Sequence, residues 1–323
     1  MSKVTVLNLD ALSYSGTTWL NLLLGSHPDV FALGPPHRVW SLKDEKFEGA
    51  CLIHGKACEF WSGFGENWDK KENFFLALAR HSGKKIFLID NAHQEFIDVT
   101  MKHQDVEVLQ GRYIRDARAI TASYVRKMSD KGISYIDSIQ PTGWFYASFM
   151  SIPSLNELQN AGQFVTHYED AVKDQTKFLK TAGDYLGIDY DESAYRFWEA
   201  DHHITSGNQG PIAMIKLYQG ENVGDFESKS VYQEQLDRLI KNPTKAFSDE
   251  RWKKQLTNDD LQEFDRLLGK KNSALGYQRS HSDLATRNHI YNIRKHSSLN
   301  HILVALKNTR AAQNIKSILK KVK

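Results

Sequence analysis

Near the start of the chain, small polar residues follow an apolar run in the pattern of a phosphate-binding turn. The run from Lys3 to Leu9 predicts a strand, and residues 17–24 predict a helix. Ser15 and Gly16 lie in the turn between them. Backbone N–H groups at a helix start, together with the positive end of the helix dipole, attract anions. We therefore expect this turn to bind phosphate.

The same turn lacks the lysine of the nucleotide-triphosphate loop G-x-x-x-x-G-K-[ST]. Ala11 stands at the first Gly position, Gly16 at the second, Thr17 at the Lys, and Thr18 keeps the hydroxyl. Without the lysine, the turn favours a ligand whose terminal group carries less charge than a triphosphate. The alternative is a Ser/Gly/Thr-rich turn that only caps a helix.

An arginine with a serine eight residues later forms a second candidate anion site. Residues 106–114 are apolar and β-branched, Arg115 follows them, and helical periodicity then resumes through Lys127. Ser123 lies about two helical turns into that element. A guanidinium and a hydroxyl at this spacing can hold one anionic group.

Two histidines follow predicted strands and are candidates for a general base. His93 comes just after the buried run of residues 84–90, and His37 comes after the short run of residues 30–33. Imidazole titrates near neutral pH, which suits proton transfer. The alternative is that each is an ordinary loop residue.

Cys51, His54 and Cys58 have C-x2-H-x3-C spacing within residues 41–68, which show no regular pattern. Three such ligands could suggest zinc, but a structural zinc site normally has four, in paired short spacings. We therefore favour two buried or loosely paired thiols and expect no metal site.

These candidates need a scaffold, and the order of elements predicts a parallel sheet. Five apolar, β-rich runs alternate with helical patterns, at residues 3–9, 30–33, 84–90, 106–114 and 163–167. This alternation is typical of α/β folds, in which loops at the strand ends face the ligand. Further helices are expected over residues 73–80, 144–158, 171–186, 191–200, 248–256 and 261–277.

Composition excludes several classes of protein. The 323 residues are 41% hydrophobic, enough to bury a core. The sequence contains no apolar run of about 18 residues that could span a membrane, and its first residues lack a signal-peptide pattern. Two cysteines do not make a disulfide framework, so we expect a cytoplasmic location.

The net charge of +3 is unevenly distributed. No acidic residue follows Asp283, whereas nine basic residues do, from Arg287 to Lys323. Apolar residues between Leu299 and Val322 fall near one face of a helix, with basic residues opposite. This tail could lie on anionic lipid, bind a partner helix, or fold back on the domain.

Four motifs, in order, resemble those of sulfotransferases that use 3′-phosphoadenosine 5′-phosphosulfate (PAPS). They are SGTTW, YIRDARAITAS, YEDAVKDQTKFLKTAGDYLGIDYD and DHHITSGNQGPI. Over roughly residues 3–277 the chain looks like a bacterial member of the family. The resemblance implies a three-layer α/β/α fold, similar to P-loop NTPases, with a central parallel sheet of four or five strands. It further implies a sulfotransferase domain at residues 1–280 and a basic, helical extension at residues 281–323.

The resemblance implies transfer of the sulfuryl group of PAPS to an acceptor hydroxyl or amine by in-line displacement. The product would be adenosine 3′,5′-bisphosphate (PAP), and no metal would be required. The residues implied to bind the cofactor are Ser15, Gly16, Thr17, Thr18, Trp19, Arg115, Ser123, Tyr168, Gly207 and Asn208. A small molecule, a glycan and a lipid remain open as acceptors, and no nucleic-acid partner is expected.

One departure from the family affects the leaving group. Members usually carry Lys or Arg directly before SGTT, where this chain has Tyr14, which donates a hydrogen bond but carries no charge. Either the backbone amides suffice, or Arg38 or Lys127 supplies a cation. His93 stands where cytosolic members carry their catalytic histidine, so we favour it as the base over His37.

Two other functions remain open. The first is a P-loop nucleotide kinase or ATPase, against which the missing lysine argues. The second is a sulfotransferase-like binding protein without catalysis. Aromatic residues within residues 58–68 and 144–149 could hold an acceptor, although such dense aromatics are more often core.

Overall fold

The computed structural model describes residues 3–37, 39, 47, 49–92, 94–221, 223, 229–245 and 248–280. His93, Arg38 and the predicted C-terminal helix lie outside these residues. The chain divides into two compact units. Unit 1 comprises Met1–Ile114 and Ala161–Ser248, and unit 2 comprises Arg115–Asn160 and Asp249–Lys323.

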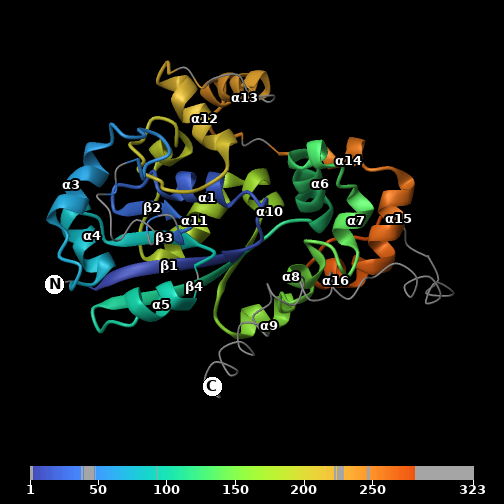
Figure 1. Ribbon diagram of the computed structural model, residues 1–323, viewed down its shortest axis with the longest axis horizontal. Coiled ribbons are helices and arrows are strands. Elements are labelled where there is room, and N and C mark those ends of the chain that lie inside the picture. The colour runs from blue at the N-terminus through green and yellow to red at the C-terminus, as the bar shows by residue number, and fades with distance from the viewer. Residues whose placement is uncertain are drawn as a thin grey trace. The chain divides into compact units, whose positions relative to one another are not determined.

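Unit 1 is built on a five-stranded sheet (Figure 1). Its strands are β1 (Val4–Ala11), β2 (Val30–Gly34), β3 (Ile86–Asp90), β4 (Val106–Ile114) and β5 (Phe164–His167). They lie in the order β2-β3-β1-β4-β5, and every neighbouring pair is parallel. The predicted α/β fold with a central parallel sheet is confirmed.

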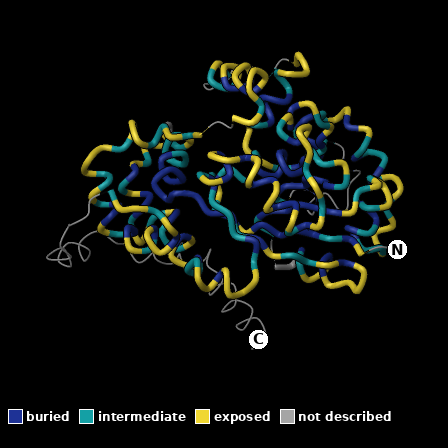
Figure 2. Tube along the Cα trace, turned by 180° about the vertical axis from the view of Figure 1, so that it is seen from behind, coloured by how far each residue is buried: buried dark blue, intermediate teal, exposed yellow. Residues whose placement is uncertain are grey.

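Helices pack on both faces of this sheet, which gives the three predicted layers. Val4 and Val6 of β1 belong to one core cluster, with residues of α3, α4 and α5, while Leu7 and Leu9 belong to another, with residues of α1, α10 and α11. The strands run through unit 1 as buried chain in Figure 2. The helices of unit 1 are α1 (Thr17–Leu24), α3 (Glu59–Asn67), α4 (Phe74–Ser82), α5 (Gln94–Thr100), α10 (Tyr168–Lys173), α11 (Gln175–Leu186), α12 (Gln209–Tyr218) and α13 (Lys229–Lys241).

The aromatic residues around α3 form core rather than an acceptor surface. Trp61 and Phe64 are buried, and Trp61 stacks on Phe47 with ring centroids 5.7 Å apart. Phe31 of β2 meets Trp61 edge-on from the sheet. The core interpretation of this segment is therefore confirmed.

Unit 2 is helical. Its helices are α6 (Ala117–Lys127), α7 (Tyr135–Ile139), α8 (Tyr146–Met150), α9 (Leu155–Asn160), α14 (Trp252–Gln255), α15 (Asn258–Leu267) and α16 (Gly269–Ala274). Asp116 caps α6 by accepting from the backbone N–H of Arg118 at 3.0 Å. Asn272 of α16 accepts from the backbone N–H of Ala117 at 3.3 Å. This cap fixes the chain at the residue that follows Arg115.

Some helix predictions were wrong. The helix expected over residues 144–158 is two helices, α8 and α9, and the one expected over residues 171–186 is interrupted at Asp174. Residues 191–200 contain only a 3-10 turn, η2 (Glu192–Tyr195). The sequence analysis missed α3, α5, α7, α12 and α13, and the helix expected over residues 261–277 is two helices, α15 and α16.

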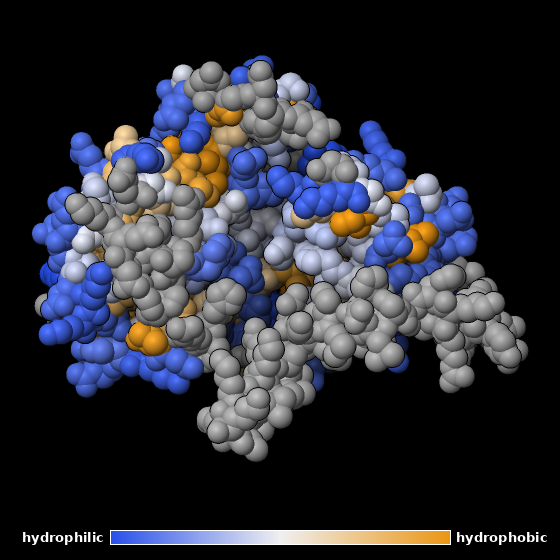
Figure 3. All heavy atoms as spheres, in the orientation of Figure 1, coloured by the Kyte–Doolittle hydropathy of each residue, from blue (hydrophilic) through white to orange (hydrophobic). Residues whose placement is uncertain are grey.

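Among the described residues, no helix combines the length and the hydropathy needed to cross a bilayer. The face shown in Figure 3 is mainly hydrophilic where it is not grey, and its hydrophobic side chains gather in small, separate areas.

Candidate functional site

The turn between β1 and α1 has the backbone of an anion-binding loop. Tyr14 and Gly16 both have positive φ angles, of 69° and 98°. Gly16 is the N-cap of α1, no side chain caps this helix, and its first turn contains no acidic residue. The first N–H groups of α1 therefore present a partial positive charge without a side-chain acceptor among the described residues. A positive φ at a tyrosine is strained, as is common at functional turns.

Asp90, at the carboxyl end of β3, holds α1 through hydrogen bonds to two of its side chains. Asn21 donates to its Oδ1 at 3.1 Å, and the Thr17 side chain also hydrogen-bonds to it. Complete burial raises the pKa of Asp90 to about 7, against the smaller lowering effect of these hydrogen bonds. The sequence analysis did not single out Asp90, although an acidic residue that ends an apolar strand was a usable signal.

Tyr168, the first residue of α10, packs against the turn. A Cβ atom added to Gly16 would lie 3.0 Å from the Tyr168 ring. The same ring meets Trp19 edge-on, with centroids 6.3 Å apart. The structure thus brings Gly16, Trp19 and Tyr168 together, and the positive φ and the close Tyr168 ring favour glycine at position 16. Ser15 is fully buried in the same turn.

The segment before α12 is tied to the same turn. The backbone N–H of Asn208 donates to Thr18 Oγ1 at 2.7 Å, and a Cβ atom at Gly207 would lie 2.8 Å from Thr18. Upstream, Thr205 donates to the Leu33 carbonyl from both its backbone N–H, at 3.3 Å, and its hydroxyl, at 3.2 Å. The Asn208 side chain caps α12 by accepting from the Gly210 N–H at 3.2 Å. The predicted residues 207 and 208 therefore lie beside Thr18.

In unit 2, Arg115 belongs to a cluster of three arginines around one carboxylate, which we call the arginine cluster. Asp249 Oδ2 lies 3.5 Å from Arg115 Nη2 and 3.4 Å from Arg126 Nη2. Arg251 donates to both carboxylate oxygens, at 2.7 and 3.0 Å. Arg126 also donates to Ser123 Oγ at 2.9 Å. The two predicted residues of this motif, Arg115 and Ser123, thus join one hydrogen-bonded group.

The arginine cluster places three guanidinium groups around one carboxylate. Burial alone would raise the pKa of Asp249, but hydrogen bonds from Arg251 and the charges of Arg115, Arg251 and Arg126 lower it to about 2. Asp249 is therefore ionised at neutral pH. Sequence reasoning missed Arg126 and Arg251, because no spacing rule links residues 115 and 251.

Only some of the candidate catalytic residues lie within the part of the chain that the structure describes. His93 and Arg38 lie outside the described residues, so their roles stay predictions. His37 is exposed after β2, and Tyr14 lies in the turn itself. Lys127 ends α6 in unit 2, and its supply of a cation to the leaving group also stays a prediction.

No protein-family model and no curated protein sequence matches the chain. Three of the solved structures that the chain resembles carry the word sulfotransferase in their titles. A sulfotransferase domain from the Synechococcus PCC 7002 olefin synthase has a TM-score of 0.43 and 16% identity over 74% of this chain and 95% of its own. A sulfotransferase domain from the curacin biosynthetic pathway has a TM-score of 0.43 and 14% identity, over 83% and 98%.

The mouse sulfotransferase SULT7A1, solved in complex with PAP, has a TM-score of 0.43 and 15% identity over 84% of each chain. At these identities the likeness concerns the fold alone.

Proposed function

We propose that the chain is a sulfotransferase that moves the sulfuryl group of PAPS to a hydroxyl or amine of an acceptor. The observation that carries this proposal is the arginine cluster of unit 2. Arg115 and Ser123 occupy the positions that the motif YIRDARAITAS predicts for binding a 3′-phosphate, and both belong to a group that contains three guanidinium groups. Guanidinium groups bind phosphate oxygens in charge-assisted pairs.

The turn of unit 1 supports the proposal by a separate observation. The uncapped amides that follow Gly16 suit the 5′-phosphosulfate, and Tyr168 beside Gly16 limits the space above them. The charge at the turn comes from backbone dipoles, since Tyr14 replaces the usual cation. A phosphosulfate tolerates this replacement better than a triphosphate does.

In the proposed reaction the acceptor oxygen or nitrogen attacks sulfur, and the bond between sulfur and the bridging phosphate oxygen breaks. His93 would take the acceptor proton, since a neutral imidazole is a suitable base near pH 7. Negative charge grows on the bridging oxygen, where the amides after Gly16 and the Tyr14 hydroxyl can donate hydrogen bonds. PAP then leaves.

The test compares the binding of PAP with that of AMP, which lacks only the 3′-phosphate, by isothermal titration calorimetry. We expect PAP to bind about 10- to 100-fold more tightly, as charge-assisted hydrogen bonds would provide. Arg115→Ala should remove most of this preference. Arg266→Ala, which removes an arginine paired with Glu263 on α15, should leave it unchanged.

Equal affinities for PAP and AMP in the unaltered chain would overturn the proposal. A different outcome would favour a binding protein without catalysis. In that case the chain binds PAP tightly, transfers no labelled sulfuryl group to any acceptor, and keeps its PAP affinity in His93→Ala.

The second candidate that the sequence left open is a P-loop kinase or ATPase. P-loop NTPases hold Mg²⁺ with the hydroxyl that follows the lysine, here Thr18, and a Walker-B Asp, whereas Asp90 hydrogen-bonds to Thr17, which stands at the lysine position. The complete burial of Asp90 and the missing lysine count against it. Mg²⁺-dependent hydrolysis of ATP would decide for this candidate.

A further inference from the structure

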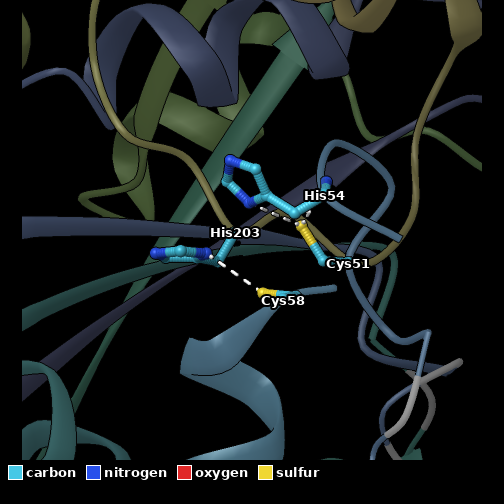
Figure 4. Close-up of side chains that lie close together, drawn as sticks. All are labelled: Cys51, His54, Cys58 and His203. Carbon is cyan, nitrogen blue, oxygen red and sulfur yellow. Dashed lines mark hydrogen bonds between the residues drawn. The ribbon is translucent and has the colours of Figure 1, made fainter. Parts of the chain in front are cut away.

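Both cysteines of the chain lie in one cluster with two histidines, in a part of unit 1 that the proposed reaction does not use. Cys51 and His54 come from the loop before α3, Cys58 is the N-cap of α3, and His203 comes from the segment before α12. The four side chains point toward one another in Figure 4. Their nearest potential ligand atoms all lie within 4.8 Å of one another.

The distances fit a single tetrahedral ion. Cys51 Sγ lies 3.5 Å from His54 Nδ1, and Cys58 Sγ lies 3.4 Å from His203 Nδ1. A zinc ion with bonds of about 2.3 Å to sulfur and about 2.05 Å to nitrogen places neighbouring ligands about 3.6 Å apart. Two sulfur and two nitrogen donors in this arrangement are typical of Zn²⁺ among the common metals.

Asp201 provides a second, independent observation. Its carboxylate lies 3.3 Å from His203 Nε2 and 3.7 Å from His54 Nε2, so it faces the outer nitrogen of both rings. Metal-bound histidines usually donate their second N–H to a carboxylate, which orients the ring and raises its basicity. Here the carboxylate lies within hydrogen-bond distance of His203 Nε2 and close to His54 Nε2, while both Nδ1 atoms face the thiols.

The surroundings also hold the ligands in place. The backbone N–H of His54 donates to Cys51 Sγ at 3.3 Å, a contact that suits a thiolate. Phe60 stacks on the His203 ring at 4.4 Å and 10°. Trp61 Nε1 donates to the His203 carbonyl at 2.7 Å. The segment that carries His203 is therefore fixed before any ion binds.

We propose that Cys51, His54, Cys58 and His203 bind one Zn²⁺ as a structural site. Four protein ligands leave no position for water, so the ion has no catalytic role. The sequence showed only three of these ligands, and His203 lies far from the C-x2-H-x3-C motif. The expectation of no metal rested on that missing fourth ligand.

Zinc at this position would join residues 51–58 to the segment that ends at Asn208. Because Asn208 donates to Thr18, the ion would help to hold this segment against the turn between β1 and α1. The zinc site would thus hold this segment in place. The zinc proposal does not depend on the proposed function.

The first experiment measures zinc in the full chain, purified under reducing and oxygen-free conditions without added metal. We expect inductively coupled plasma mass spectrometry to find about one Zn²⁺ per chain. Replacement by Co²⁺ should give the visible absorption of tetrahedral cobalt and a thiolate-to-metal charge-transfer band. Since the chain has two cysteines, this band reports on Cys51 and Cys58 alone.

Variants separate the site from adventitious binding. Cys58→Ser and His203→Gln should abolish stoichiometric zinc and the cobalt spectrum. His103→Gln, at an exposed histidine paired with Asp105, should leave both unchanged. Asp201→Asn keeps all four ligands and should fold, yet it should weaken zinc affinity about 10- to 100-fold in competition with a chelator.

The proposal is overturned if the purified chain holds only traces of metal and gives no cobalt spectrum. It is likewise overturned if alkylation and mass analysis show that Cys51 and Cys58 form a disulfide in the reduced preparation. Unchanged zinc affinity in Asp201→Asn would contradict the geometry on which the site rests.

Discussion

Asp90 is a buried carboxyl group next to the turn between β1 and α1, and its burial changes its pKa. It is 1% exposed and its hydrogen bonds come from Asn21 and Thr17 of α1 and from Asn91, so a charge there has little access to water. Its folded-state pKa of about 7 exceeds the ordinary value of 3.8, because burial disfavours the ionised form. The folded chain therefore binds this proton more tightly than the unfolded chain does.

The pH dependence of stability follows from this difference. The contribution of Asp90 to the free energy of unfolding is complete below about pH 4 and is lost as the pH rises through about 7. Asp90→Asn carries no such charge, so its free energy of unfolding should fall less between about pH 5 and about pH 8. The difference in slope should not exceed about 1.4 kcal/mol per pH unit. Urea denaturation at several pH values measures it, and parallel curves for the two proteins would contradict the assignment.

Sequence reasoning found the residues that lie close together in the chain and missed those that arrive from elsewhere. Residues 15–19 form one turn because an apolar strand and a helix flank them. Arg251 and His203 approach their partners only through the packing of distant segments. Residue spacing along the chain does not predict contacts between distant segments. The arginine cluster and the fourth metal ligand could therefore be identified only from the structure.

At the scale of the element, the conformation of the turn between β1 and α1 depends on Gly16. Its φ is 98°, which strains any residue with a Cβ atom, and a Cβ atom added there would lie 3.0 Å from the Tyr168 ring, so a larger residue is disfavoured at position 16. Gly16→Ala should lose about 1–2 kcal/mol of stability. It should also bind PAP about tenfold more weakly, because displaced amides no longer converge on the anion.

Gly187→Ala is the matched control for this change. Gly187 ends α11 with φ of 72°, and an added Cβ atom there meets nothing within 4 Å. This variant should lose similar stability, measured by thermal unfolding, and keep the PAP affinity of the unaltered chain. If both variants bind PAP alike, the turn does not hold the nucleotide.

Strands were easier to predict than helices for a physical reason. Each strand of a parallel sheet is covered on both faces, so it appears in the sequence as a compact apolar run. Helix ends depend on single capping contacts. Asp174 accepts from the Lys177 N–H and starts α11 anew, and Asp191 accepts from the Ser193 N–H at the start of the 3-10 turn η2. Helix α3 was missed because Gly63 and Gly65 lower the helix propensity of its sequence.

At the scale of the whole molecule, charge is concentrated in the basic residues that follow Asp283. If this tail lies on anionic lipid rather than on a partner helix or on the domain, the full chain should bind vesicles that contain phosphatidylserine, since each basic residue near an anionic surface contributes about 1 kcal/mol. Replacement of Lys316, Lys320 and Lys321 by glutamine should weaken this binding. Co-sedimentation measures it, with phosphatidylcholine vesicles as the control. Equal binding to both kinds of vesicle would exclude an electrostatic contact with lipid.

The strand order has a consequence for how unit 1 responds to thermal fluctuation. β1 has a hydrogen-bonded neighbour on each side, whereas β2 and β5 each have one. Local unfolding begins where a strand has the fewest such bonds, so the outer strands separate first and β1 last. The loop that precedes α1 therefore stands on the most protected backbone of the sheet. Gentle warming would loosen the margins of unit 1 while the anion-binding amides keep their alignment.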